Sequence, residues 1–291
     1  MKKPAIFLSG LFLFLLGLEF VIRQRAAADL GAWETRPFPS PDLQANRIVV
    51  LGDSIAFAPD LAAEEAWPAL LERRLEQERP DQRWQVINAG VSGNTAADAY
   101  ARFAQHVRAY HPHTVLIALG LNDCRQVYRA IDQRRITSFT RNESFAKTYG
   151  LGRFYLFRAL LNHLAPLPTA DYTIEQEANG PRVPPETFAA LLKWLVNASK
   201  RLHAQPILLS LTPISEELDP ARSSEFAHWS GYNALVEEIA RRLQVPLIAV
   251  SQPFPDASYW AADGVHLSAL GETEIANRVW AGLQPQLAIG N

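Results

Sequence analysis

Short apolar runs alternate with segments of helical periodicity over most of this 291-residue chain. Five runs carry mostly apolar residues, at 47–51 (RIVVL), 84–88 (WQVIN), 114–119 (TVLIAL), 206–211 (PILLSL) and 246–250 (PLIAV). Apolar residues also recur with helical spacing, at about 67–79, 95–110, 186–204, 229–244 and 268–284. Strands this uniformly apolar are typical of a parallel sheet that is covered on both faces. Joined by right-handed crossovers, these elements predict a three-layer α/β/α domain.

Two local patterns indicate where helices begin. Pro68 fits a first helical turn, where its missing N–H would have no helical partner in any case. Thr95 and Asp98 have the spacing of a capping box, in which each side chain accepts a hydrogen bond from the backbone of the other residue. The helices are therefore expected to begin near residues 67 and 95.

The first 45 residues break the alternation. Two lysines precede an uncharged stretch at 5–18, and two arginines follow the next apolar residues. This pattern predicts either a cleaved signal peptide or a membrane anchor within residues 1–25. The rest of the chain would then be anchored outside the cytoplasm, or be secreted or periplasmic after cleavage. Residues 26–45 contain three prolines and no period, which predicts a linker.

Composition narrows the chemistry. The formal net charge of -2 gives no general reason to expect nucleic acid as a partner. Cys124 is the single cysteine, which excludes an intramolecular disulfide and a multi-cysteine metal site. Six of the seven histidines, at 106, 111, 113, 163, 203 and 228, show no metal-ligand spacing. We therefore expect an activity that needs neither a metal nor an organic cofactor.

Four clusters of small and polar residues follow predicted strands or introduce the last helix. They lie at 52–54 (GDS), 88–95 (NAGVSGNT), 120–123 (GLND) and 263–266 (DGVH). Ligands of open parallel sheets bind at the carboxyl ends of the strands. The clusters are therefore expected to meet at one edge of the sheet.

The first and last clusters contain the residue types of nucleophilic catalysis. Ser54 alone could simply cap the next helix. As a nucleophile it would need a base, and the unperturbed pKa of histidine suits that task. On what should be a strand-end turn, Asp263 lies three residues before His266 and can hold one of its ring nitrogens. We predict Ser54, Asp263 and His266 as the catalytic residues.

The second and third clusters offer hydrogen-bond donors for an oxyanion. Each donor aimed at the oxyanion of an acyl-transfer intermediate stabilises it by roughly 3 to 4 kcal/mol. The backbone N–H of Gly93 and the side-chain amide of Asn122 are the predicted donors, and the N–H of Ser54 is a third.

In order and approximate spacing, the four clusters resemble the four sequence blocks of the SGNH (GDSL-type) hydrolases. The stretch 65–75 (EAWPALLERRL) is also similar to the helix after the nucleophile in bacterial multifunctional lysophospholipase/thioesterase members. The resemblance implies a flavodoxin-like sheet of five parallel strands, within a domain at 46–287. It implies the same roles for the residues named above: Ser54, Gly93, Asn122, Asp263 and His266.

The chain departs from this family in two places. Ile55 stands where the family name has leucine, an exchange between apolar residues. The stretch at about 125–185 is far longer than a compact member needs between its third strand and next helix. Because of this insertion, the resemblance does not identify the substrate.

The insertion is basic and aromatic. Residues 125–165 carry eight basic residues and two acidic ones. One interpretation is a solvated basic surface over a small local core. The other is a lid that attracts an anionic substrate, or docks on an anionic lipid leaflet through an amphipathic helix at 151–164. The candidates for substrate specificity are Arg125, Tyr128, Arg129, Arg134 and Arg135.

The sequence thus predicts a serine ester hydrolase that cleaves an acyl ester of a lipid or a carbohydrate through an acyl-enzyme. An O-acyltransferase with the same catalytic residues would differ in the acceptor that its pocket admits. A catalytically silent binding protein on the same fold is a third interpretation.

Overall fold

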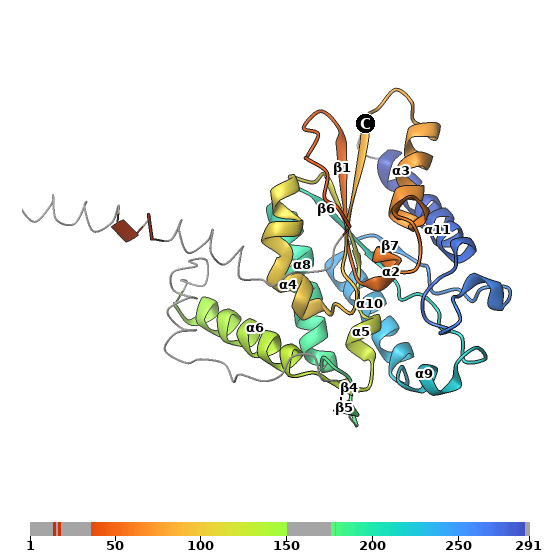
Figure 1. Ribbon diagram of the computed structural model, residues 1–291. Coiled ribbons are helices and arrows are strands. Elements are labelled where there is room, and N and C mark those ends of the chain that lie inside the picture. The colour runs from red at the N-terminus through yellow and green to blue at the C-terminus, as the bar shows by residue number, and fades with distance from the viewer. Residues whose placement is uncertain (1–13, 16, 19–35, 150–175, 178, 289–291) are drawn as a thin grey trace, which may run out of the picture.

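A five-stranded parallel sheet forms the centre of the protein (Figure 1). The computed structural model describes residues 14–15, 17–18, 36–149, 176–177 and 179–288. The strands are β1 (Asn46–Gly52), β2 (Trp84–Gly90), β3 (Thr114–Ala118), β6 (Gln205–Leu209) and β7 (Leu247–Ile248). Their order is β2-β1-β3-β6-β7, the flavodoxin-like order of a doubly wound sheet. The predicted parallel α/β/α architecture is confirmed.

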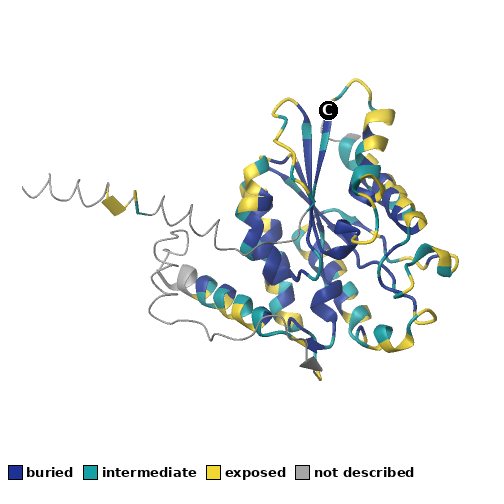
Figure 2. Cartoon of the chain, viewed as in Figure 1, coloured by how far each residue is buried: buried dark blue, intermediate teal, exposed yellow. Residues whose placement is uncertain are grey.

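Helices cover both faces of the sheet. α3 (Trp67–Glu78) and α11 (Ala269–Ala288) pack together on one face, against β2 and β7. α4 (Ala96–His106), α8 (Pro185–Arg201) and α10 (Trp229–Leu243) pack on the other face. Figure 2 shows that the strands and the inward faces of these helices are buried. Apolar residues of all five strands belong to one core, which explains why the strand sequences lack alternation.

Both predicted helix starts are confirmed. Pro68 lies in the first turn of α3. Thr95 caps α4, and its N–H donates to Asp98 Oδ2 at 2.7 Å while the Asp98 N–H donates to Thr95 Oγ1 at 3.4 Å. Strand β7 is shorter than the apolar run at 246–250, because only Leu247 and Ile248 pair with β6.

Shorter elements connect these units. They are α2 (Ser54–Phe57), α5 (Leu121–Cys124) and α9 (Pro220–Ser224), with 3-10 turns at Ala63–Glu65, Arg108–Tyr110 and Ala257–Tyr259. The predicted insertion contains α6 (Ala130–Tyr149) and the antiparallel pair β4 (Val127–Tyr128) and β5 (Gln176–Glu177). α6 packs on α4 through an edge-to-face contact of Tyr100 with Phe139, 5.0 Å between ring centroids. The predicted amphipathic helix at 151–164 lies outside the described residues.

The predicted N-terminal targeting segment falls largely outside the described residues. In the part of the chain that the structure describes, no helix is both long and apolar enough to span a bilayer. From Arg36 on, the predicted linker packs on the domain. Arg36 donates to the carbonyls of Phe57 and Leu61, at 2.9 and 2.7 Å. Phe38 contacts the rings of His106 and Tyr110. The Arg36 hydrogen bonds hold the chain that follows Ser54, and the Phe38 contacts attach the segment to α4 and the turn after it.

A buried carboxyl group joins the two helices on one face. Glu272 of α11 accepts a hydrogen bond from the backbone N–H of Trp67, the first residue of α3, at 2.6 Å. Burial raises the pKa of Glu272 to about 8, against the opposing effects of the Trp67 N–H and the Arg36 charge. The folded protein therefore keeps a proton on Glu272 at pH values where an unfolded glutamate has lost it.

We predict that Glu272 makes the protein less stable as the pH rises from about 4.5 to about 8. The raised pKa means that the folded state binds more protons than the unfolded state in this window, so the free energy of unfolding falls with increasing pH. Glu272→Gln keeps an acceptor for Trp67 and cannot ionise. Urea unfolding should show the variant close to wild type near pH 5 and more stable by roughly 4 to 5 kcal/mol near pH 9.

Glu274→Gln is the matched control, because it removes a partly exposed carboxylate from the same helix. This control should keep the wild-type loss of stability with pH. A difference between Glu272→Gln and wild type that stays constant from about pH 5 to 9 would contradict the prediction.

Candidate active site

The register of the sheet brings three of the four clusters together. Gly52, the last residue of β1, lies beside Gly90 at the end of β2 and Ala118 at the end of β3. Ser54 follows this level by two residues, so it begins next to the loops that carry the second and third clusters. As predicted from the order of the motifs, one edge of the sheet collects them.

Ser54 lies on a tight turn between β1 and α2. It is the first residue of α2, and the side chain of Asp53 caps the helix by accepting from the Ile55 N–H at 3.0 Å. The helix lies directly against β2, since a Cβ on Gly90 would come within 2.5 Å of the Phe57 nitrogen. Glycine at position 90 therefore allows this turn to form. The N–H of Ser54, at the first position of the helix, has no intrahelical acceptor.

His266 and Asp263 form a hydrogen-bonded pair. The Nδ1 atom of His266 lies 2.6 Å from Asp263 Oδ2, and Asp263 Oδ1 accepts from the N–H groups of His266 and Val265 at 2.9 and 3.0 Å. Burial alone would raise the pKa of Asp263, but these N–H groups and the imidazole outweigh it and lower the pKa. An imidazole that donates from Nδ1 to Asp263 presents Nε2 as a proton acceptor.

The Asp263–His266 pair lies close to the serine turn. Burial raises the pKa of Asp53, the residue before Ser54, to about 6. The Ile55 N–H and then His266 oppose this effect, which indicates that the imidazole lies near Asp53. Asp53 also borders a small void of about 20 Å³ lined mainly by apolar side chains. The last cluster, more than 200 residues from the first, therefore reaches the same edge of the sheet.

Gly93 and Asn122 flank the serine turn from the two neighbouring loops. Gly93 has φ of +72°, a left-handed conformation that favours glycine. Asn122, in α5, is buried and its Nδ2 lies 3.4 Å from Asp53 Oδ2. Its Oδ1 accepts from Arg182 Nη1 at 3.2 Å. The structure thus brings every predicted catalytic and oxyanion residue to one edge.

Asp123, the residue after Asn122, connects α5 to the start of α4. Both of its carboxylate oxygens accept from the Ala96 N–H, at 2.9 and 3.1 Å, at the start of α4. Burial raises the pKa of Asp123 to about 7, while the Ala96 N–H and then the Arg182 charge oppose it. This contact ties the Asn122 segment to the loop that carries Gly93.

Arg102 is buried at the same edge of the sheet, although the motifs of the sequence do not include it. Its guanidinium donates to the carbonyl oxygens of Gly52 and Ala89, each at 2.7 Å, and to Asn94 Oδ1 at 2.6 Å. Burial lowers its pKa to about 9, against the opposing charge of Asp53. Arg102 therefore fastens the ends of β1 and β2 to the loop after Gly93. The spacing of four between Asp98, Arg102 and His106 could have revealed a polar stripe on the inner face of this helix.

Two of the five specificity candidates lie in ion pairs within the protein. Arg125 is buried and pairs with Glu225. Arg135 pairs with the buried Asp98 of the capping box, which attaches α6 to α4. These two side chains serve the packing of the predicted insertion.

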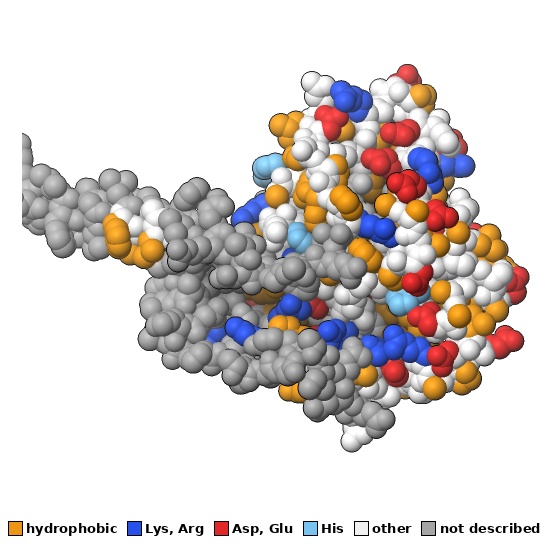
Figure 3. Space-filling model, in the orientation of Figure 1, with side chains coloured by type: hydrophobic (Ala, Val, Ile, Leu, Met, Phe, Trp, Pro, Cys, Tyr) orange, Lys and Arg blue, Asp and Glu red, His pale blue; other side chains and the backbone are white. Residues whose placement is uncertain are grey.

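The other three candidates lie nearer the surface. Arg129 approaches the loop that carries Gly93, since its Nη1 would lie 3.4 Å from a Cβ built on Gly93. Tyr128 and Arg134 are exposed, Tyr128 by 41%. Figure 3 shows Lys and Arg side chains in a band over α6 and toward α9, interspersed with acidic ones. Part of the basic charge predicted for the insertion therefore lies on the exposed side of α6 (Figure 3).

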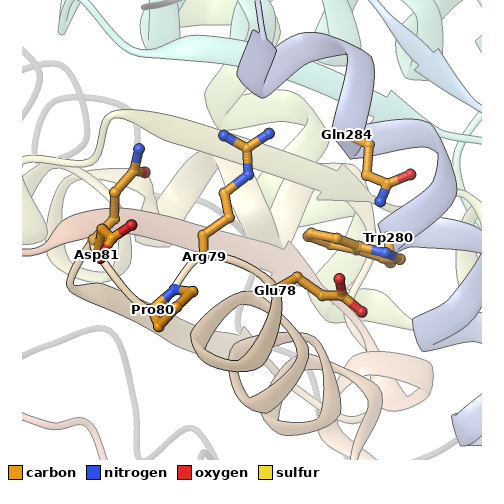
Figure 4. Close-up of a pocket in the computed structure, with 7 residues that line it drawn as sticks. Glu78, Arg79, Pro80, Asp81, Trp280 and Gln284 are labelled. Atoms are coloured by element: carbon orange, nitrogen blue, oxygen red, sulfur yellow. The ribbon is translucent and has the colours of Figure 1, made fainter.

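A larger surface pocket lies away from these residues. It measures about 370 Å³ and lies between the end of α3 and the last turns of α11, where Glu78 and Arg79 face Trp280 and Gln284 (Figure 4). Among the described residues, no three His, Cys, Asp or Glu side chains are grouped as metal ligands would be.

A serine turn beside an Asp–His pair is the arrangement of serine hydrolases, which occur on several unrelated folds. The chain belongs to the GDSL-like Lipase/Acylhydrolase family, whose sequence model matches residues 50–273. The resemblance of the four motifs to the SGNH (GDSL-type) hydrolases is therefore confirmed.

Individual relatives support this membership. The chain is 42% identical over 79 residues to "Esterase TesA" of Pseudomonas aeruginosa, covering 27% of this chain and 38% of the relative. It is 35% identical over 83 residues to "Thioesterase 1/protease 1/lysophospholipase L1" of Escherichia coli, covering 27% and 36%. The match thus spans less than two fifths of each relative. The solved lipase/acylhydrolase of Enterococcus faecalis has a similar fold, with a TM-score of 0.56, 18% identity and coverage of 83% and 96%.

Proposed function

We propose that this protein is a serine ester hydrolase that cleaves an acyl ester of a lipid or a carbohydrate. The observation that carries the proposal is the 2.6 Å contact between His266 and Asp263 beside the turn that presents Ser54. An oriented imidazole next to a serine at a helix start supplies the base that serine lacks at neutral pH.

In the proposed first step, His266 Nε2 takes the proton of the Ser54 hydroxyl as Oγ attacks the ester carbonyl. Asp263 stabilises the imidazolium that forms. The carbonyl oxygen becomes an oxyanion, which accepts hydrogen bonds from the N–H groups of Ser54 and Gly93 and from the Asn122 amide. The tetrahedral intermediate then collapses, and the leaving alkoxide receives the proton from His266.

In the second step, water releases the acyl group from Ser54. His266 takes a proton from the water as its oxygen attacks the acyl-enzyme, and the same oxyanion donors act again. Collapse of this intermediate returns the proton to Ser54 Oγ and releases the carboxylic acid. Substrate specificity is assigned to the surface beside the oxyanion loop, where Arg129 approaches Gly93 and Tyr128 is exposed.

The test compares the purified full-length chain with Ser54→Ala. Each is incubated with short-chain aryl esters, alone and together with a panel of sugar acceptors. Release of the alcohol and the free acid without an acceptor, lost in Ser54→Ala, is the expected result. Acyl product that forms only with a sugar acceptor would indicate an O-acyltransferase instead. Equal hydrolysis by the two proteins would contradict catalysis by Ser54. If neither protein forms a product, the binding protein is the interpretation that remains.

A further inference from the structure

A buried ion pair lies inside the predicted insertion, next to the catalytic edge. Arg182 donates from Nε and Nη2 to the two oxygens of Asp132, at 2.9 and 3.0 Å. Both side chains are 1% exposed. Two buried charges are costly to desolvate, so their geometry has to be nearly ideal for the pair to persist. A bidentate contact of this kind fixes the plane of the guanidinium.

The same guanidinium has a third partner in the site. Arg182 Nη1 donates to Asn122 Oδ1 at 3.2 Å. With the amide oxygen held on this side, Nδ2 of Asn122 points the other way, toward Asp53 at 3.4 Å. A flipped amide would place its NH₂ group against the guanidinium, so that two donors would face each other in a buried position. Arg182 therefore selects one orientation of the Asn122 side chain.

Backbone hydrogen bonds hold Arg182 in place. Its N–H donates to the carbonyl of Arg125 at 2.9 Å, and the next N–H, of Val183, donates to the carbonyl of Asp123 at 3.2 Å. The chain that closes the insertion thus runs along the segment that carries Asn122. The fixed cation also polarises the Asn122 amide, which makes its N–H group a stronger donor.

We propose that Arg182, oriented by Asp132, is a positioning residue for the oxyanion hole. It holds the Asn122 amide so that Nδ2 is aimed at the developing oxyanion before the substrate binds. This inference rests on the proposed function, because it takes Asn122 as an oxyanion donor. The insertion then contributes to the rate of the reaction as well as to the surface around the site.

The experiment measures kcat and KM for a short-chain aryl ester in Arg182→Lys, Asn122→Ala and the double variant. A lysine cannot hold Asp132 with two N–H groups and Asn122 with a third. We expect Arg182→Lys to lower kcat by about 10- to 100-fold, and Asn122→Ala by about 10²- to 10³-fold, with KM changed less than about twofold in both. In the Asn122→Ala background, Arg182→Lys should lower kcat no further, because the amide that Arg182 positions is absent.

Arg47→Lys is the matched control. Arg47 is also a buried arginine, and it donates to the carbonyl oxygens of Tyr110 and Ala45 at the opposite end of the sheet. This variant should keep the wild-type kcat. Asp132→Asn, which preserves the side-chain shape, gives a second route if Arg182→Lys does not fold, and should lower kcat in the same direction with KM unchanged.

These outcomes distinguish the catalytic roles of Ser54 and Asn122 from the positioning role of Arg182. Full activity of Ser54→Ala or a wild-type kcat in Asn122→Ala would overturn the proposed catalytic residues themselves. If Asn122→Ala loses kcat while Arg182→Lys or Asp132→Asn folds and keeps it, the positioning role is wrong. A loss from Arg182→Lys that multiplies the loss from Asn122→Ala would overturn it as well, since the two residues would then act independently.

Discussion

Replacing His266 with alanine is expected to lower kcat for ester hydrolysis by about 10⁵- to 10⁶-fold. The loss is large because the imidazole supports both proton transfers to and from the reacting oxygens. Ser54→Ala should cost a similar factor, and the double variant should be no slower than either single variant, because the two residues act as one unit. The measurement is steady-state hydrolysis of an aryl ester by variants that unfold at the wild-type urea concentration.

Asp263→Asn should cost less, on the order of 10⁴-fold, because it leaves the base in place but favours the wrong tautomer. The lowered pKa of Asp263 means that this carboxylate stays ionised at neutral pH and continues to orient the imidazole. His113→Ala is the control, since His113 accepts from the Arg47 N–H at the far end of the sheet. Activity of His266→Ala within about tenfold of wild type, beside an inactive Ser54→Ala, would exclude His266 as the base.

The fold could be predicted because its signals are local. Each strand contains a short, mostly apolar run, such as IVVL at 48–51, and each major helix has either a capping residue or a clear period. Burial on both faces then leaves few arrangements besides a parallel sheet. The apolar run at 246–250 predicts a longer strand than β7, because apolar residues near a strand end do not show where pairing stops.

The shared position of the candidate catalytic residues could be predicted because each follows a strand or precedes the last helix. Chain order and the strand-end rule bring Ser54, Gly93, Asn122 and His266 to one edge without any knowledge of their contacts. Arg182 could not be found in this way. It is separated from Asn122 by 60 residues of an insertion, and no local period connects the two.

Buried charges were the other omission, because a charged residue in a helical pattern is usually assigned to the solvent face. Arg125 and Arg135 remain predicted specificity residues, but the sequence does not show that each forms an ion pair with a distant acidic residue. The pairing of such residues depends on tertiary packing, which composition and spacing do not encode. The burial of Arg102 could not be predicted for the same reason, since its acceptors include Gly52, 50 residues earlier in the chain.

Arg102→Met is expected to reduce the free energy of unfolding by about 3 to 5 kcal/mol, a large part of the stability of an ordinary domain. Methionine fills much of the same space but donates no hydrogen bond. The carbonyl oxygens of Gly52 and Ala89 and the side chain of Asn94 would each lose a buried donor, at a cost of roughly 1 to 3 kcal/mol per group. The saved cost of burying the guanidinium, visible in its lowered pKa, offsets only part of this loss.

Urea unfolding of Arg102→Met beside Arg74→Met checks this expectation. Arg74 pairs with Glu78 at 3.0 Å on the exposed face of α3, so its replacement should change stability by less than about 0.5 kcal/mol. Equal unfolding midpoints for the two variants would contradict a structural role for Arg102. The folded fraction of Arg102→Met should also hydrolyse esters more slowly than wild type, because the lost hydrogen bonds release Gly52, two residues before Ser54, and Asn94, next to Gly93. A destabilised variant with wild-type kcat would show that the serine turn and the loop that carries Gly93 keep their geometry without Arg102.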